Sequence, residues 1–100
     1  MDLFAKLRDS LKARFPTTPV SVRRCKVPRK LCGDCSRKAD HFLVRIDPSF
    51  CIQVQLDTLI HEFAHAVAYL EWENTEDHGP EFGMAYAICY QVYEKIVSQQ

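Results

Sequence analysis

The chain has 100 residues, of which 47% are hydrophobic and 26% are charged. This length predicts one domain over residues 1–100, and this composition argues against both a disordered tail and a membrane protein. Thirteen basic and thirteen acidic residues give a formal net charge of zero. Residues 1–50 hold 12 basic and 5 acidic side chains, whereas residues 51–100 hold 1 and 8. The resulting balances of +7 and −7 predict an electrically polar molecule.

The cysteine content predicts a reducing compartment. There are five cysteines, an odd number, and the first residues lack the apolar run of a secretory signal, so no disulfide framework is expected. No run of roughly 18 apolar residues is present, which argues against a membrane span. We therefore expect a protein of the cytoplasm, or of the nucleus in a cell that has one.

The first elements are a helix and two strands. Apolar residues recur at helical spacing from Leu3 to Phe15, and Pro16 ends the pattern, so an amphipathic helix is expected at the N-terminus. Apolar and polar residues then alternate over 20–22 and again over 42–46. This alternation predicts two antiparallel strands.

Turns and helices complete the pattern. Residues 32–35 read as a turn, and the alternation over 50–54 fits either a short third strand or the lead-in to a helix. From about Asp57 the apolar period becomes helical, and this core helix is expected to end near Glu71. A final helix begins at Pro80. The fold class is therefore α+β: an N-terminal helix, a small antiparallel sheet of two or three strands, a core helix and a C-terminal helix.

A short motif on the core helix carries the chemistry. It reads His61-Glu62-Phe63-Ala64-His65, and residues four positions apart share one helix face. His61 and His65 can therefore place two imidazole nitrogens about 2.0–2.1 Å from one zinc ion. Glu62 is placed to take a proton from a metal-bound water, whose pKa zinc lowers to about 7. The alternative is a pair of hydrogen-bonded core histidines.

A catalytic zinc needs a third protein ligand and an open fourth position. His78 is the best candidate, because it follows the core helix and an acidic connector, and Gly79 and Pro80 favour a sharp return of the chain. Glu81 and Asp77 are rival ligands. Either carboxylate would leave His78 as an unexplained loop histidine.

These two segments resemble the SprT-like metallopeptidase family, which includes the Spartan proteases. The family pattern is H-E-x-x-H, a variable connector and then H-G-x-x-[FW], and residues 61–65 and 78–82 match both halves. The form of residues 77–86 looks especially like small SprT-like proteins of bacteriophages. The resemblance implies a minimal zincin-like domain, one zinc bound by His61, His65 and His78, and Glu62 as general base. It also implies a relation to proteases that cut proteins attached to DNA.

A basic segment precedes the core helix. It can contact the phosphates of nucleic acid, or it can be a solvated hairpin whose charges keep an edge strand soluble. Its seven cations, opposed only by Asp34, are Arg23, Arg24, Lys26, Arg29, Lys30, Arg37 and Lys38.

The same segment holds three cysteines. Cys25, Cys32 and Cys35, together with His41, can form a second, structural zinc site, but one C-x-x-C is only half of the usual signal, so a single zinc is expected. The alternative is a hairpin turn that carries small thiols. Cys51 and Cys89 are expected to pack in the core.

Two functions follow. The favoured one is a zinc-dependent endopeptidase that acts on protein or peptide substrates, in which the strand over 42–46 pairs with an extended substrate. Tyr69 or Tyr86 can supply a stabilising hydroxyl, although tyrosines at helical spacing more often pack. The other is a non-catalytic, zinc-stabilised module that binds nucleic acid through residues 23–38; Glu62 argues against it. A monomer with no membrane partner is expected in either case.

Overall fold

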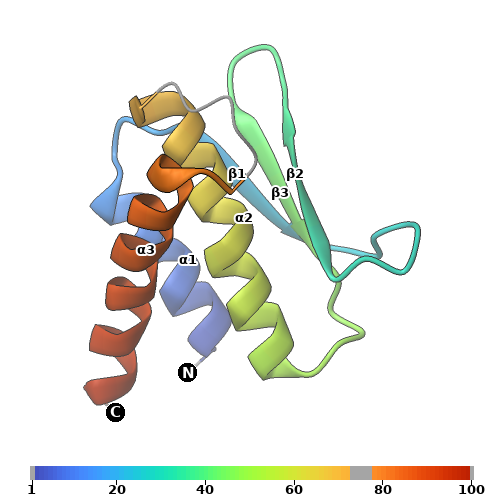
Figure 1. Cartoon of the computed structure of the whole chain (residues 1–100). Helices are drawn as coiled ribbons and strands as arrows, with labels where there is room; N and C mark the ends of the chain where they lie inside the picture. Colours follow the sequence, from blue (N-terminus) through green and yellow to red (C-terminus); the bar gives the residue numbers. More distant parts are fainter. Residues whose placement is uncertain (1, 73–77, 100) are drawn as a thin grey trace.

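A computed structural model describes residues 2–72 and 78–99 of the chain (Figure 1). In chain order its elements are α1 (Leu3–Arg14), β1 (Val20–Arg24), β2 (Gly33–Arg37), β3 (Phe42–Ile46), α2 (Ile52–Trp72) and α3 (Pro80–Ser98). The α+β fold class is confirmed.

The expected N-terminal helix, α1, is present and capped. The Asp2 side chain accepts a hydrogen bond from the Phe4 amide at 3.0 Å, which pairs one of the amides that a helix start leaves without a partner. Phe4, Leu7 and Leu11 lie on one face and are buried. Helix α1 thus closes one side of the core, as its apolar spacing predicts.

The sheet differs from the expectation in two ways. Its strand order is β1-β3-β2, with β1 parallel and β2 antiparallel to β3. The prediction that residues 20–22 and 42–46 form an antiparallel pair is wrong, because the intervening segment is itself a strand and reverses the chain twice. Residues 32–35 are for the same reason not the expected turn, since Gly33–Arg37 pairs along β3. The sheet is mixed.

Helix α2 forms the centre of the molecule. It starts at Ile52, so most of the ambiguous segment 50–54 belongs to the helix and not to a strand. Helix α2 contacts both other helices as well as β2 and β3, so apolar side chains are needed on more than one of its faces. Fully buried members are Leu59, Ile60, Phe63, Ala64, Ala66 and Val67.

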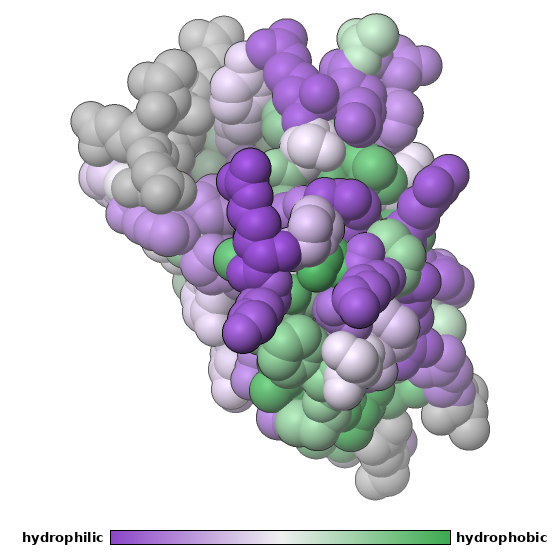
Figure 2. All heavy atoms as spheres, turned by 90° about the vertical axis from the view of Figure 1, so that its right-hand side faces the viewer, coloured by the Kyte–Doolittle hydropathy of each residue, from purple (hydrophilic) through white to green (hydrophobic). Residues whose placement is uncertain are grey.

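All three helices lie on one side of the sheet (Figure 1). On β3, Phe42, Val44 and Ile46 are buried against them, whereas Leu43 and Arg45 alternate onto the open face. Figure 2 looks onto the sheet side of the molecule, the right-hand side of Figure 1, where many hydrophilic side chains are visible. None of the helices that the structure describes is long and apolar enough to cross a membrane.

Candidate metal centre

Three imidazoles meet at one point. His61 and His65 lie one turn apart on α2, and His78 lies just before α3. Their Nε2 atoms are 3.3 Å apart for His61 and His65, 3.1 Å for His65 and His78, and 3.2 Å for His78 and His61. The structure thus brings the three predicted ligands together as a triangle of nitrogen atoms.

This triangle suits a metal ion better than mutual hydrogen bonds. An Nε2 atom is either an N–H donor or a lone-pair acceptor, so three of them cannot all hydrogen-bond to one another. Around a tetrahedral zinc with bonds of about 2.0–2.1 Å, two ligand nitrogens are about 3.3–3.4 Å apart. The observed distances of 3.1–3.3 Å are close to this value. The donor set therefore fits a zinc ion.

His78 reaches the triangle through an unusual backbone conformation. Its φ angle is 58°, in the left-handed region that residues with a Cβ atom rarely adopt. Gly79 follows as the extended N-cap of α3, and Pro80 occupies the first helical turn, where its missing N–H is no loss. This tight entrance to α3 turns the imidazole back toward α2.

Phe82 supports all three rings. Its ring centroid lies 5.1 Å from that of His61, 4.4 Å from that of His65 and 4.8 Å from that of His78, and the residue is 8% exposed. The sequence pattern includes Phe82 as the last residue of the H-G-x-x-[FW] segment but gives it no role. Its position one turn after His78 is the signal that could have identified it as the packing partner of the ligands.

Glu62 borders an open cavity of about 350 Å³ beside the triangle. The cavity lies between the start of β2 and the two long helices, and its lining consists of Cys32, Gly33, Asp57, Thr58, His61, Glu62 and Tyr86. His61 contributes to both the triangle and the cavity. A carboxylate, a ligand imidazole and a space that can admit a substrate are therefore adjacent.

The sequence profile of the SprT-like family matches residues 1–99. The chain belongs to the SprT-like family. No curated protein and no solved structure matches it significantly. The motif resemblance at residues 61–65 and 78–82 is thus supported by a match over nearly the whole chain.

The rival ligands do not join the centre of this SprT-like chain. Among the side chains that the structure describes, His61, His65 and His78 are the only group of three or more potential metal ligands with donor atoms within 4.8 Å of one another. Glu81 lies in the first turn of α3 but outside this group. Asp77 lies outside the described residues.

The cysteines of the basic segment do not converge. Within the described part of the chain, Cys25, Cys32 and Cys35 form no group of three ligands, with or without His41, so the candidate second metal site is not formed. Burial, followed by the charges of Glu62 and Asp34, raises the pKa of Cys35 to about 12, which disfavours the thiolate that binds metal.

The other two cysteines lie in different environments. Cys89 is buried in the core, as expected, and burial raises the pKa of its thiol to about 12. Cys51, also expected in the core, is exposed just before α2. Cys51 directly precedes α2, and the first two residues of that helix, Ile52 and Gln53, are exposed as well.

Two of the seven basic side chains serve the fold. Arg24 donates to the Gln55 side chain at 2.7 and 3.0 Å and to Asp2 at 3.2 Å, tying the N-terminus and β1 to α2. Arg37 donates to the hydroxyl of Tyr69. The remaining five are exposed: Arg23, Lys26, Arg29, Lys30 and Lys38.

The structure also shows where the expected substrate strand and the two candidate tyrosines lie. The segment 42–46 is β3, the central strand, which pairs on both sides, so the expectation that it pairs with a substrate is wrong. Tyr69 packs against Phe42 with ring centroids 5.4 Å apart and accepts from Arg37. Tyr86, in contrast, lines the cavity with Glu62.

Proposed function

We propose that this SprT-like chain is a zinc-dependent metalloendopeptidase that hydrolyses peptide bonds in protein substrates. The observation that carries the proposal is the triangle of Nε2 atoms at 3.1–3.3 Å, with the Glu62 carboxylate on the neighbouring cavity. Three protein ligands and one accessible side are typical of catalytic zinc, whereas structural sites are closed by four. A purely structural site would have no use for the carboxylate.

The chemistry divides between the ion and the chain. A zinc ion held by His61, His65 and His78 would polarise the scissile carbonyl and lower the pKa of a bound water to about 7. Glu62 takes the proton from the attacking water and returns it to the leaving amine. Phe82 packs against all three imidazole rings and restricts their orientation. The Tyr86 hydroxyl, on the same cavity, is the candidate donor to the oxygen that gains charge.

The strand next to the cavity is an edge strand. In the described part of the chain, β2 pairs only with β3. The amide of Lys38 donates to the carbonyl of His41, and the amide of Asp47 donates to the carbonyl of Cys32. In this antiparallel register, the backbone groups of Asp34 and Ser36 therefore point toward β3. Those of the odd-numbered residues of β2 point away from it.

This edge can hold an extended substrate. The backbone N–H and C=O groups of Gly33, Cys35 and Arg37 point away from β3, and Gly33 borders the cavity that Glu62 lines. Backbone pairing with an edge strand is independent of substrate sequence, which suits an endopeptidase. We assign to β2 the substrate-pairing role that the sequence pattern suggested for β3.

The test is the substitution Glu62→Gln. It should leave about one zinc per chain, measured by plasma mass spectrometry, and reduce cleavage of unfolded casein by at least about a hundredfold. Asp57→Asn, which removes a carboxylate from the same cavity one turn away, is the matched control and should retain cleavage. Cleavage that survives Glu62→Gln would refute the proposal.

A second role in nucleic-acid binding is favoured by the five exposed cations of the segment 23–38. Five phosphate contacts predict that the logarithm of the affinity for duplex DNA falls with the logarithm of salt concentration with a slope of about −4.5. Charge reversal at Arg23, Lys26 and Lys30 should flatten this slope without changing zinc content. DNA binding with zinc bound and no cleavage would favour the non-catalytic module instead.

The cellular setting is part of the same proposal. All five cysteines are unpaired, which favours a reducing compartment. We therefore place the protein in the cytoplasm of a bacterial or phage-infected cell, in line with the phage-like form of residues 77–86.

A further inference from the structure

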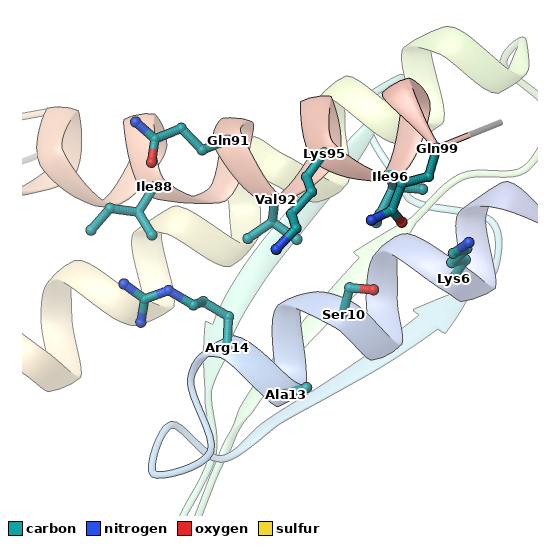
Figure 3. Close-up of a pocket in the computed structure, with 10 residues that line it drawn as sticks. All are labelled: Lys6, Ser10, Ala13, Arg14, Ile88, Gln91, Val92, Lys95, Ile96 and Gln99. Atoms are coloured by element: carbon teal, nitrogen blue, oxygen red, sulfur yellow. The ribbon is translucent and has the colours of Figure 1, made fainter.

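A second cavity lies away from the candidate metal centre, in a groove between α1 and α3 (Figure 3). We call it the α1–α3 groove; its volume is about 520 Å³. Ile88, Val92 and Ile96 follow one another at intervals of four on α3, so they form a single apolar stripe along the groove. Ile96 is buried, and the other two are partly buried against the core. The floor of the groove is thus apolar.

Three cations line this floor. Lys6 and Arg14 are eight residues apart on α1, which places them on one face about 12 Å apart. Figure 3 shows Arg14 near Ile88 at one end, Lys6 near the opposite end and Lys95 of α3 between them. None of the described side chains that line the groove is acidic. Positive charge therefore accompanies the apolar stripe along its whole length.

We propose that the α1–α3 groove docks an acidic amphipathic helix of another protein. The apolar stripe requires an apolar face in the occupant, and the three cations require carboxylates along its flanks. From Ile88 to Gln99 the groove is about 16 Å long, which matches about three turns of helix. A nucleic-acid backbone would satisfy the cations but would leave the stripe of Ile88, Val92 and Ile96 against charged phosphates.

This surface is independent of the proposed peptidase activity. The groove shares no lining residue with the cavity at Glu62. A partner bound there would leave the catalytic side open, so the docked protein can position the peptidase without blocking it.

The experiment uses a synthetic 15-residue helical peptide with leucines on one face and glutamates flanking them. Its fluorescence anisotropy is titrated with the zinc-loaded full chain. The triple variant Lys6→Glu, Arg14→Glu, Lys95→Glu should weaken binding at least about tenfold, a loss of about 1.4 kcal/mol. The matched control, Arg23→Glu, Lys26→Glu, Lys38→Glu, changes the net charge equally on exposed side chains outside the groove, and it should weaken binding less than about twofold.

Several outcomes would overturn the proposal. Equal losses in the two triple variants, equal affinity for a peptide with glutamine in place of glutamate, or no anisotropy change up to about 1 mM would each exclude an acidic helix. Competition by phosphatidylserine vesicles that is lost in the groove variant would assign the surface to a membrane instead. A dimer in sedimentation that dissociates only in the groove variant would assign it to a second copy of the chain.

Discussion

At the scale of the residue, His78 decides whether the centre is a three-ligand site. Its Nε2 atom closes the triangle with His61 and His65 at 3.2 and 3.1 Å. His78→Ala should therefore reduce zinc affinity at least about a hundredfold, since changes even to groups that only orient a ligand cost about 10–100-fold. The measurement is competition with a chelating dye.

The control for His78→Ala is a substitution of Glu81, the rival ligand in the first turn of α3. Glu81→Gln should leave zinc affinity within about twofold, because Glu81 lies outside the ligand group. If Glu81→Gln lost zinc and His78→Ala kept it, the ligand assignment would be wrong.

A second residue, Asp47, gives a pH dependence. Hydrogen bonds from the Ser49 hydroxyl at 2.7 Å, the Ser49 amide at 2.9 Å and the Val27 amide at 3.1 Å hold the pKa of Asp47 below its ordinary value of 3.8. The carboxylate therefore contributes stability that is complete above pH 3.8 and is lost as the pH falls through the lower folded pKa. Asp47→Asn should lower stability at neutral pH and flatten its decline in acid.

Urea unfolding at several pH values between about 2 and 6 measures this effect. Ser49→Ala should act in the same direction but less strongly, because the Val27 amide still donates to Asp47. An acid decline that is identical in wild type and Asp47→Asn would contradict the assignment.

Part of the site could be predicted at this scale because the helical repeat alone places His61 beside His65. His78 followed from its position after the helix and from the turn chemistry of Gly79 and Pro80. The position of Phe82 one turn after His78 indicates that it lies near the ligands, but its contact with all three rings depends on the register of α3 against α2, which packing across the whole core determines. The failure of Cys25, Cys32 and Cys35 to form a ligand group could not be predicted either. Their spacing is a local property of the sequence, whereas the distances between them depend on how the sheet is paired.

At the scale of the element, Gly33 controls how closely β2 approaches α2. A Cβ atom there would lie 2.5 Å from the carbonyl oxygen of Arg45 and 2.7 Å from Cγ2 of Thr58. Thr58 cannot easily turn away, because its hydroxyl donates to the Val54 carbonyl at 2.6 Å. Gly33→Ala should therefore destabilise the fold by about 1–3 kcal/mol and displace the edge strand from the cavity.

Gly83 is the matched control, because a Cβ atom there meets nothing within 4 Å. It lies within α3, where glycine costs about 0.5–1 kcal/mol relative to alanine, so Gly83→Ala should stabilise by that amount. Urea unfolding of both variants checks the opposite signs. Destabilisation of similar size in both would show that the close approach at Gly33 is not the cause.

Helices were more predictable than strands in this chain. The apolar repeat of α1 depends only on its own sequence, and so its residues and its end before Pro16 agree with the structure, where the last helical residue is Arg14. The segment Gly33–Arg37 carries turn residues and little apolar alternation, and it becomes a strand only because β3 pairs with it. Strand order and direction arise from such distant pairings, which a local pattern does not contain.

At the scale of the whole molecule, the ligands join two parts of a small core. His61 and His65 belong to α2, whereas His78 leads into α3, so an ion at the centre links the two long helices. Zinc at a hundred times its dissociation constant should stabilise the fold by about 2.7 kcal/mol. For a chain of this size that corresponds to a rise in melting temperature of about 10–20 °C.

Differential scanning calorimetry with zinc and with a chelator measures this linkage. The double variant His61→Ala, His65→Ala is the control, and zinc should leave its melting temperature unchanged. A wild-type melting temperature that does not respond to zinc would show that the three imidazoles do not bind the ion in the folded state.

The left-handed backbone of His78 has a consequence for how the ion exchanges. A residue other than glycine held at a φ of 58° stores about 1 kcal/mol, whereas His61 and His65 project from regular helical turns. Detaching the third imidazole releases that strain, but detaching either of the others releases nothing. We therefore expect zinc to bind first to His61 and His65 and only then to His78. When the ion dissociates, the His78 imidazole should detach first.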